Sequence, residues 1–139
     1  MRQRFLSLFG SFCMFALLVN AQTSDPALQG KWTVIGAQHN GKPMDGLTGG
    51  VMTVTNDRFE IRTASGSLLK GALQINTSTK PAMMGMLHDS GMRWEAIYEV
   101  EGEDFKLNYV DAGGKDKRPT AFKTSAATEE TLVILKRAK

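Results

Sequence analysis

The sequence predicts an all-β fold, an eight- to nine-stranded antiparallel up-and-down barrel, from three observations. Short segments rich in β-branched and aromatic residues recur about every ten residues, with turn residues between them. No segment after Pro26 keeps the 3.6-residue apolar period of a helix. The first segment opens with Trp32 and the last ends with Arg137, as expected where the two terminal strands pair and remove the sheet edges.

The first half of the chain is predicted to contain four strands. A turn at Asn56 and Asp57 joins the second and third strands into a hairpin. In the third strand Phe59 and Ile61 alternate with charged residues, which indicates one buried face. Between residues 44 and 50, three glycines favour a loop over a helical turn. The four expected strands are residues 31–38, 51–55, 58–62 and 68–75.

The second half continues the same pattern. Trp94, Ala96, Tyr98 and Val100 fall on one face of a single segment. Phe105, Leu107 and Tyr109 share a face of the next segment, and a glycine-rich loop at 111–117 follows it. The expected strands are residues 82–88, 93–100, 105–109, 119–123 and 131–137.

Residues 1–21 have the pattern of a cleavable signal peptide. Arg2 and Arg4 precede a mostly apolar run of 15 residues, 5–19, and Val19 and Ala21 are the small residues that a signal peptidase reads. An uncleaved membrane anchor is the alternative, but this run is short for the ~20 residues of a spanning helix. We therefore expect cleavage after Ala21, a secreted or periplasmic protein without a membrane span, and one domain over residues 22–139.

Cleavage changes the charge and the cysteine content. It leaves 118 of the 139 residues and takes away two Arg and no acid, so the net charge falls from +3 to +1. Such a balance argues against nucleic acid as a partner. Cys13 leaves with the signal, so the mature chain has no disulfide, zinc–thiolate site or thiol nucleophile. No cofactor is expected.

Two arrangements are open for the residues expected to be structural, Gly30, Trp32 and Arg137. If the terminal strands run antiparallel, Trp32 and Arg137 lie at the same end of the barrel. The guanidinium then covers the indole in a cation–π contact that closes this end. In the other arrangement Trp32 is an ordinary core residue and Arg137 is a solvated charge near the end of the chain.

A family resemblance extends over nearly all of the mature chain. The segments in which it lies are Leu28-Gln29-Gly30-Lys31-Trp32, Asn40-Gly41-Lys42-Pro43, Lys70-Gly71, Lys80-Pro81, Ile97-Tyr98-Glu99, Gly102, Leu107, Arg118-Pro119-Thr120-x-Phe122 and Leu135-Lys136-Arg137. In this order and spacing they resemble the secreted lipocalin-like (calycin-like) domains of Planctomycetes and related environmental bacteria. The resemblance implies an eight-stranded barrel-like fold and no established activity. The chain departs from the family after Pro81, where Met83-Met84-Gly85-Met86 stands in place of a polar or acidic strand.

An eight-stranded barrel either fills its interior with side chains or holds one small ligand. We expect a non-enzymatic binding protein for a small apolar or amphipathic ligand, because inward aromatic residues suit such a pocket. Phe59 and Phe122 are further candidates for the interior. A filled interior would instead favour a secreted protein-interaction or inhibitor module that contacts a protein partner through its surface. The residues expected to line a cavity are Trp94, Tyr98, Phe105, Tyr109 and Met84.

Two further chemistries are weighed against structural explanations. Met84, Met86 and His88 share one face of a strand, and thioether and imidazole groups suit Cu(I). Methionine more often fills irregular gaps in a core, so the copper site is the weaker alternative. His88, Asp89 and Ser90 are the residue types of a hydrolytic triad. Neighbouring residues on an extended chain point to opposite faces, so these three side chains cannot align as a triad. We expect no catalytic residues.

Overall fold

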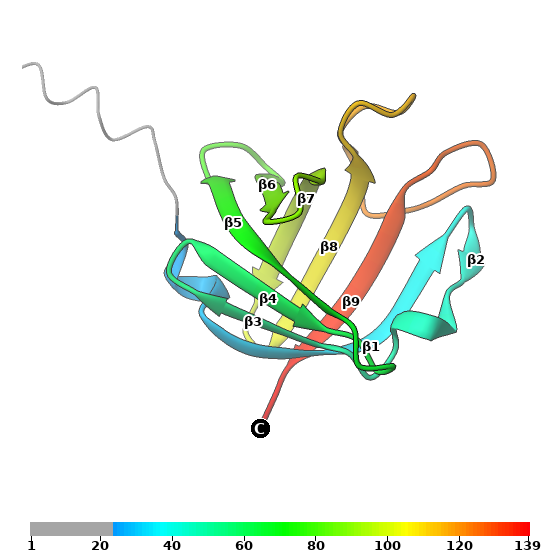
Figure 1. Cartoon of the computed structure of the whole chain (residues 1–139). Helices are drawn as coiled ribbons and strands as arrows, with labels where there is room; N and C mark the ends of the chain where they lie inside the picture. Colours follow the sequence, from blue (N-terminus) through cyan, green and yellow to red (C-terminus); the bar gives the residue numbers. More distant parts are fainter. Residues whose placement is uncertain (1–23) are drawn as a thin grey trace, which may run out of the picture.

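Residues 24–139, the part of the chain that the computed structural model describes, form a closed eight-stranded antiparallel barrel with one short extra strand. Figure 1 shows the strands following one another around the barrel in chain order. This confirms the predicted fold class. The predicted signal peptide, residues 1–21, lies outside the described residues. Within residues 24–139 no helix is long and apolar enough to cross a membrane.

Each barrel strand pairs with the next one in the sequence, and β9 pairs with β1 to close the sheet. The short strand β2 pairs only with the end of β1. Residues 24–139 also contain two 3-10 turns, η2 before the first strand and η3 between β2 and β3. The elements are η2 (Pro26–Leu28), β1 (Gly30–His39), β2 (Lys42–Pro43), η3 (Asp45–Leu47), β3 (Val51–Thr55), β4 (Arg58–Arg62), β5 (Leu68–Asn76), β6 (Ala82–His88), β7 (Arg93–Glu101), β8 (Asp104–Asp111) and β9 (Thr131–Arg137).

Closure depends on the long first strand, which is shared between two neighbours. Its beginning pairs with β3, and nearly its whole length pairs with β9, from Trp32 opposite Arg137 to His39 opposite Thr131. The register shifts between Val34 and Gly36. Such a bulge bends a strand and increases its twist, which lets β1 leave β3 and follow β9.

One end of the barrel is closed by η2 and Trp32. Leu28 of η2 and Trp32 are both fully buried in the core. The Trp32 indole Nε1 donates a hydrogen bond of 2.9 Å to the Leu28 carbonyl oxygen. The Phe105 ring packs against the indole at 5.1 Å between centroids, in an edge-to-face arrangement. The 3-10 turn therefore covers this end of the core, and the hydrogen bond from Trp32 holds it in place.

Arg137 completes this closure, and the stacked arrangement is the one observed. Its guanidinium carbon lies 4.1 Å from the centroid of the Trp32 ring. Its Nη1 and Nη2 atoms donate to the carbonyl oxygens of Gln29 (2.8 Å) and Ala27 (3.1 Å). Gly30 makes room for this, because its φ is +112° and a Cβ there would lie 3.1 Å from Arg137 Nη1.

The predicted short strand at residues 119–123 is wrong. This segment belongs to an irregular connection between β8 and β9 that contains no strand. The Asn108 amide, which points out of β8, donates to the carbonyl oxygens of Ala121 (2.7 Å) and Lys123 (3.0 Å). Phe122 lies outside the barrel, with Lys106 Nζ 5.0 Å from its ring centroid. A side chain thus satisfies backbone groups that the prediction had assigned to a sheet.

The same connection is fixed to the outer face of the sheet by Arg118. Its Nη1 donates to the carbonyl oxygens of Met84 (2.9 Å) and Ala96 (2.7 Å), and its Nη2 lies 3.3 Å from Glu95 Oε1. The connection explains why outward-facing positions of the last three strands are buried. These positions are Ile97, Asn108, Val110 and Leu132. A second, smaller difference from the prediction is η3, a 3-10 turn within the expected loop at 44–50.

Candidate functional site

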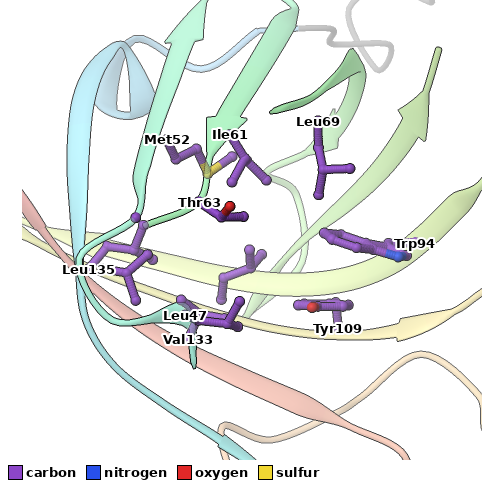
Figure 2. Close-up of a pocket in the computed structure, with 12 residues that line it drawn as sticks. Leu47, Met52, Ile61, Thr63, Leu69, Trp94, Tyr109, Val133 and Leu135 are labelled. Atoms are coloured by element: carbon purple, nitrogen blue, oxygen red, sulfur yellow. The ribbon is translucent and has the colours of Figure 1, made fainter. Parts of the chain in front are cut away.

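The other end of the barrel contains an apolar pocket (Figure 2). Its cavity volume is about 60 Å³. The pocket is therefore narrow. Its lining residues are Val34, Leu47, Gly50, Met52, Ile61, Thr63, Leu69, Trp94, Leu107, Tyr109, Val133 and Leu135.

The pocket has an apolar floor and a partly exposed rim, and none of its twelve residues is charged. The floor residues Met52, Leu107 and Leu135 are buried core residues. At the rim, Leu47 and Leu69 are partly exposed. Figure 2 shows Leu69 approaching the space from one side and Leu47 from the other. The site thus offers apolar contacts to a molecule that enters from this end.

Two stacked aromatic rings form one wall of the pocket. Trp94 of β7 and Tyr109 of β8 lie 4.0 Å apart between centroids, with 17° between their planes. Burial raises the pKa of Tyr109 to about 12, a hydrogen bond with Thr131 opposes the rise, and the negative charge of Asp111 adds to it. Tyr109 is therefore a neutral phenol at physiological pH.

The aromatic wall extends from Trp94 along the inner face of the barrel. The His88 ring lies 4.3 Å from Trp94 and 5.2 Å from Phe59, edge-on to both. Phe59 and His88 sit on strands that flank β5, and Gly71 of β5 is opposite both of them in register. Because Gly71 has no side chain, the two rings meet across β5.

His88 is a polar group in an apolar setting. It is 5% exposed, and neither ring nitrogen has a hydrogen-bond partner among residues 24–139. Burial lowers the pKa of His88 below its usual 6.5, and the charges of Asp111 and Asp89 partly oppose this. The imidazole is therefore neutral at neutral pH, and protonation would place a charge in the core.

This burial predicts a pH dependence of stability. Below about pH 6.5 the unfolded chain takes up a proton on His88 before the folded protein does, so the free energy of unfolding falls as the pH drops through 6.5. We expect His88→Phe, which keeps an aromatic ring, to remove that part of the loss. Urea unfolding at pH 7.5 and 5.5 measures it.

The matched control is His39→Gln, since the chain has two histidines and His39 lies half-buried at the surface. His39→Gln should keep the decrease in stability between pH 7.5 and 5.5. If His88→Phe loses as much stability over that interval as the wild type does, His88 is not the group that titrates.

The structure brings together two of the five residues proposed to bind ligand. Trp94 and Tyr109 line the pocket. Tyr98, Phe105 and Met84 are buried in the core and are absent from the pocket wall. The Tyr98 hydroxyl donates to Asp25 Oδ2 at 2.8 Å, on the side of η2. Burial, with the hydrogen bond and charge of Asp25, raises the pKa of Tyr98 well above its usual range.

Sequence reasoning missed most of the pocket lining. Leu47 belongs to a segment read as a loop, and its approach to the barrel depends on η3. Leu69 and Thr63 flank the β4–β5 turn, where the sequence showed only that a turn is present. The alternation in β5 does place Leu69, Leu73 and Ile75 on one face, and this signal was available.

The copper alternative gains no support from the geometry. Met84, Met86 and His88 are buried and share the inner face of β6, as predicted. A strand rises about 3.3 Å per residue, so Met84 and His88 are about 13 Å apart along β6. One ion cannot bind both of them while both point into the core. Within residues 24–139 no group of three His, Cys, Asp or Glu side chains is placed to hold a metal ion.

Comparison with known proteins gives no relative. No family model, curated protein or solved structure matches the chain. The assignment of the barrel rests on its strand order and on the pairing of β1 with β9.

Proposed function

We propose that this chain is an exported, non-enzymatic, lipocalin-like binding protein that takes a small apolar or amphipathic ligand into the open end of its barrel. The main support is the apolar pocket whose wall is the Trp94–Tyr109 stack. Ligand sites are typically concave and mostly apolar, with a few polar groups that fix orientation. Three lining residues, Trp94, Tyr109 and Thr63, have a side chain with an N–H or O–H group.

The size of the pocket limits the ligand. Its cavity volume of about 60 Å³ is well below the ~300–1,000 Å³ of typical small-molecule sites, so only part of a ligand can enter it. Such a small cavity favours a thin ligand, such as an alkyl chain or one flat ring, over a globular one. Apolar surface buried by such a ligand contributes roughly 25 cal/mol per Å² before the costs of association.

Export and the lipocalin-like family are part of the proposal. Residues 1–21 have the charge, the apolar run and the small residues of a cleaved signal. At the closed end Arg137 covers Trp32, which is the stacked arrangement that the Gly-x-Trp and arginine positions in the sequence suggested. A non-enzymatic role is consistent with His88 facing the interior while Asp89, beside it, pairs with Arg58 on the outside at 3.0 Å.

A titration with N-phenyl-1-naphthylamine, a neutral apolar fluorophore, tests the pocket. We expect enhanced emission with saturable binding to the mature protein. Trp94→Ala removes half of the aromatic wall and should weaken binding about 10-fold or more, a loss of about 1.4 kcal/mol. The ligand itself should appear in a native mass spectrum of protein from an exporting host as a mass that is lost on activation.

The matched control is Ile35→Ala, because Ile35 is 51% exposed and is not a pocket residue. It should bind the fluorophore like the wild type. If the wild type does not bind, or if Trp94→Ala binds equally well, the pocket is not a ligand site. A filled barrel that works through a protein partner is then the better hypothesis.

A further inference from the structure

A second hollow adjoins the apolar pocket and shares its aromatic wall. Trp94 and Tyr109 line both spaces. The second hollow has a volume of about 280 Å³, and its lining includes charged side chains, which the first pocket lacks. Its charged and polar side chains are His39, Asp111, Lys115, Asp116, Glu129 and Thr131. A ligand that covers the aromatic wall would therefore have an apolar part on one side and a polar part on the other.

The charges of this hollow are mostly negative. Three carboxylates line it and face a single lysine, Lys115. His39 also lines the hollow: its Nδ1 lies 3.0 Å from the Thr131 hydroxyl oxygen, and its Nε2 lies 3.9 Å from Glu129 Oε1. An anionic head group placed here would be repelled, whereas a cationic one would be attracted.

Among the three carboxylates of this hollow, Asp111 lies opposite Trp94 in the β7–β8 register. It is exposed, and it makes no hydrogen bond or ion pair through its side chain within residues 24–139. Its charge acts on both Tyr109 and His88. The Asp111 carboxylate is thus available to a ligand beside the stacked rings.

We propose that the ligand is an amphiphile with a positively charged amine head. This proposal rests on the proposed function and names its ligand class. The apolar chain enters the pocket, and the ammonium lies at the edge of the Trp94–Tyr109 stack beside Asp111. Aromatic faces attract ammonium groups, most strongly where water is partly excluded, so the wall and the carboxylate select the same charge.

Three amphiphiles with the same chain test the charge preference: dodecyltrimethylammonium, dodecyl maltoside and dodecyl sulfate, each below its micelle concentration. Isothermal titration calorimetry measures the affinities in about 20 mM salt. We expect the cation to bind about 10-fold more tightly than the sulfate, with the maltoside between them. In 300 mM NaCl the difference should shrink, because salt screens exposed charges.

Asp111→Asn should weaken binding of the cation about threefold and leave the maltoside unchanged. Glu101→Gln is the matched control, because Glu101 is an exposed acid at the other end of β7. It should change the affinity for neither the cation nor the maltoside. Equal affinity for the three amphiphiles, or tighter binding of the sulfate, overturns the amine head and leaves the proposed function standing. If none of the three binds, the proposed function fails as well.

Discussion

Replacing Trp32 with alanine is expected to lower the free energy of unfolding by about 3–5 kcal/mol, the usual cost of removing a fully buried large aromatic ring. The side chain is 0% exposed. Its loss leaves a cavity between Phe105, η2 and Arg137, and it removes the hydrogen bond to the Leu28 carbonyl. Equilibrium unfolding in guanidinium chloride at pH 7.5 measures the change.

Trp32→Phe separates the ring from its N–H group. It keeps an aromatic surface under Arg137 but leaves the Leu28 carbonyl without its donor, which costs about 1–3 kcal/mol for a buried group. We expect the free energy of unfolding of Trp32→Phe to lie between the values of Trp32→Ala and the wild type. If the free energy of unfolding of Trp32→Ala lies within 1 kcal/mol of the wild-type value, the closed end does not depend on this residue.

The fold was predictable because several strands show their buried face in the sequence and turn residues separate the others. Alternation set the inward side of β4 and β7, and polar turn residues set the ends of β6 and β9. The closing pair of strands was predictable from their terminal residues, Trp32 and Arg137. Residues 119–123 were misread because their burial comes from contact with the outside of the barrel, where alternation gives no information.

The candidate site was only partly predictable because alternation defines a face but not a height along the barrel. Trp94 and Tyr98 share the inner face of β7, and four residues of strand separate them by about 13 Å. Trp94 therefore reaches the open pocket, whereas Tyr98 bonds to Asp25 near η2. The Trp32–Arg137 pair marks the closed end, but η2, which covers it, and η3, which lies beside the pocket, are single turns with weak sequence signals.

Gly71→Ala should be the most damaging glycine substitution in the barrel wall. A Cβ at residue 71 would lie 2.8 Å from His88 Cα and would meet the Leu87 carbonyl oxygen even more closely. Both are backbone atoms, so no flexible side chain can move aside, and β5 and β6 must separate. Overpacking of this kind typically costs 1–3 kcal/mol, and we expect about 3 kcal/mol or more in urea unfolding.

Gly36→Ala is the matched control for this prediction. Gly36 also lies in a strand, and nothing stands within 4 Å of a Cβ placed on it. Its free energy of unfolding should lie within about 0.5 kcal/mol of the wild-type value. If the two variants are equally stable, β5 and β6 do not approach as closely as the structure has them. A large loss for Gly71→Ala alone is the expected result, because the Phe59 and His88 rings meet across residue 71 and the neighbouring strand leaves no room there for a Cβ.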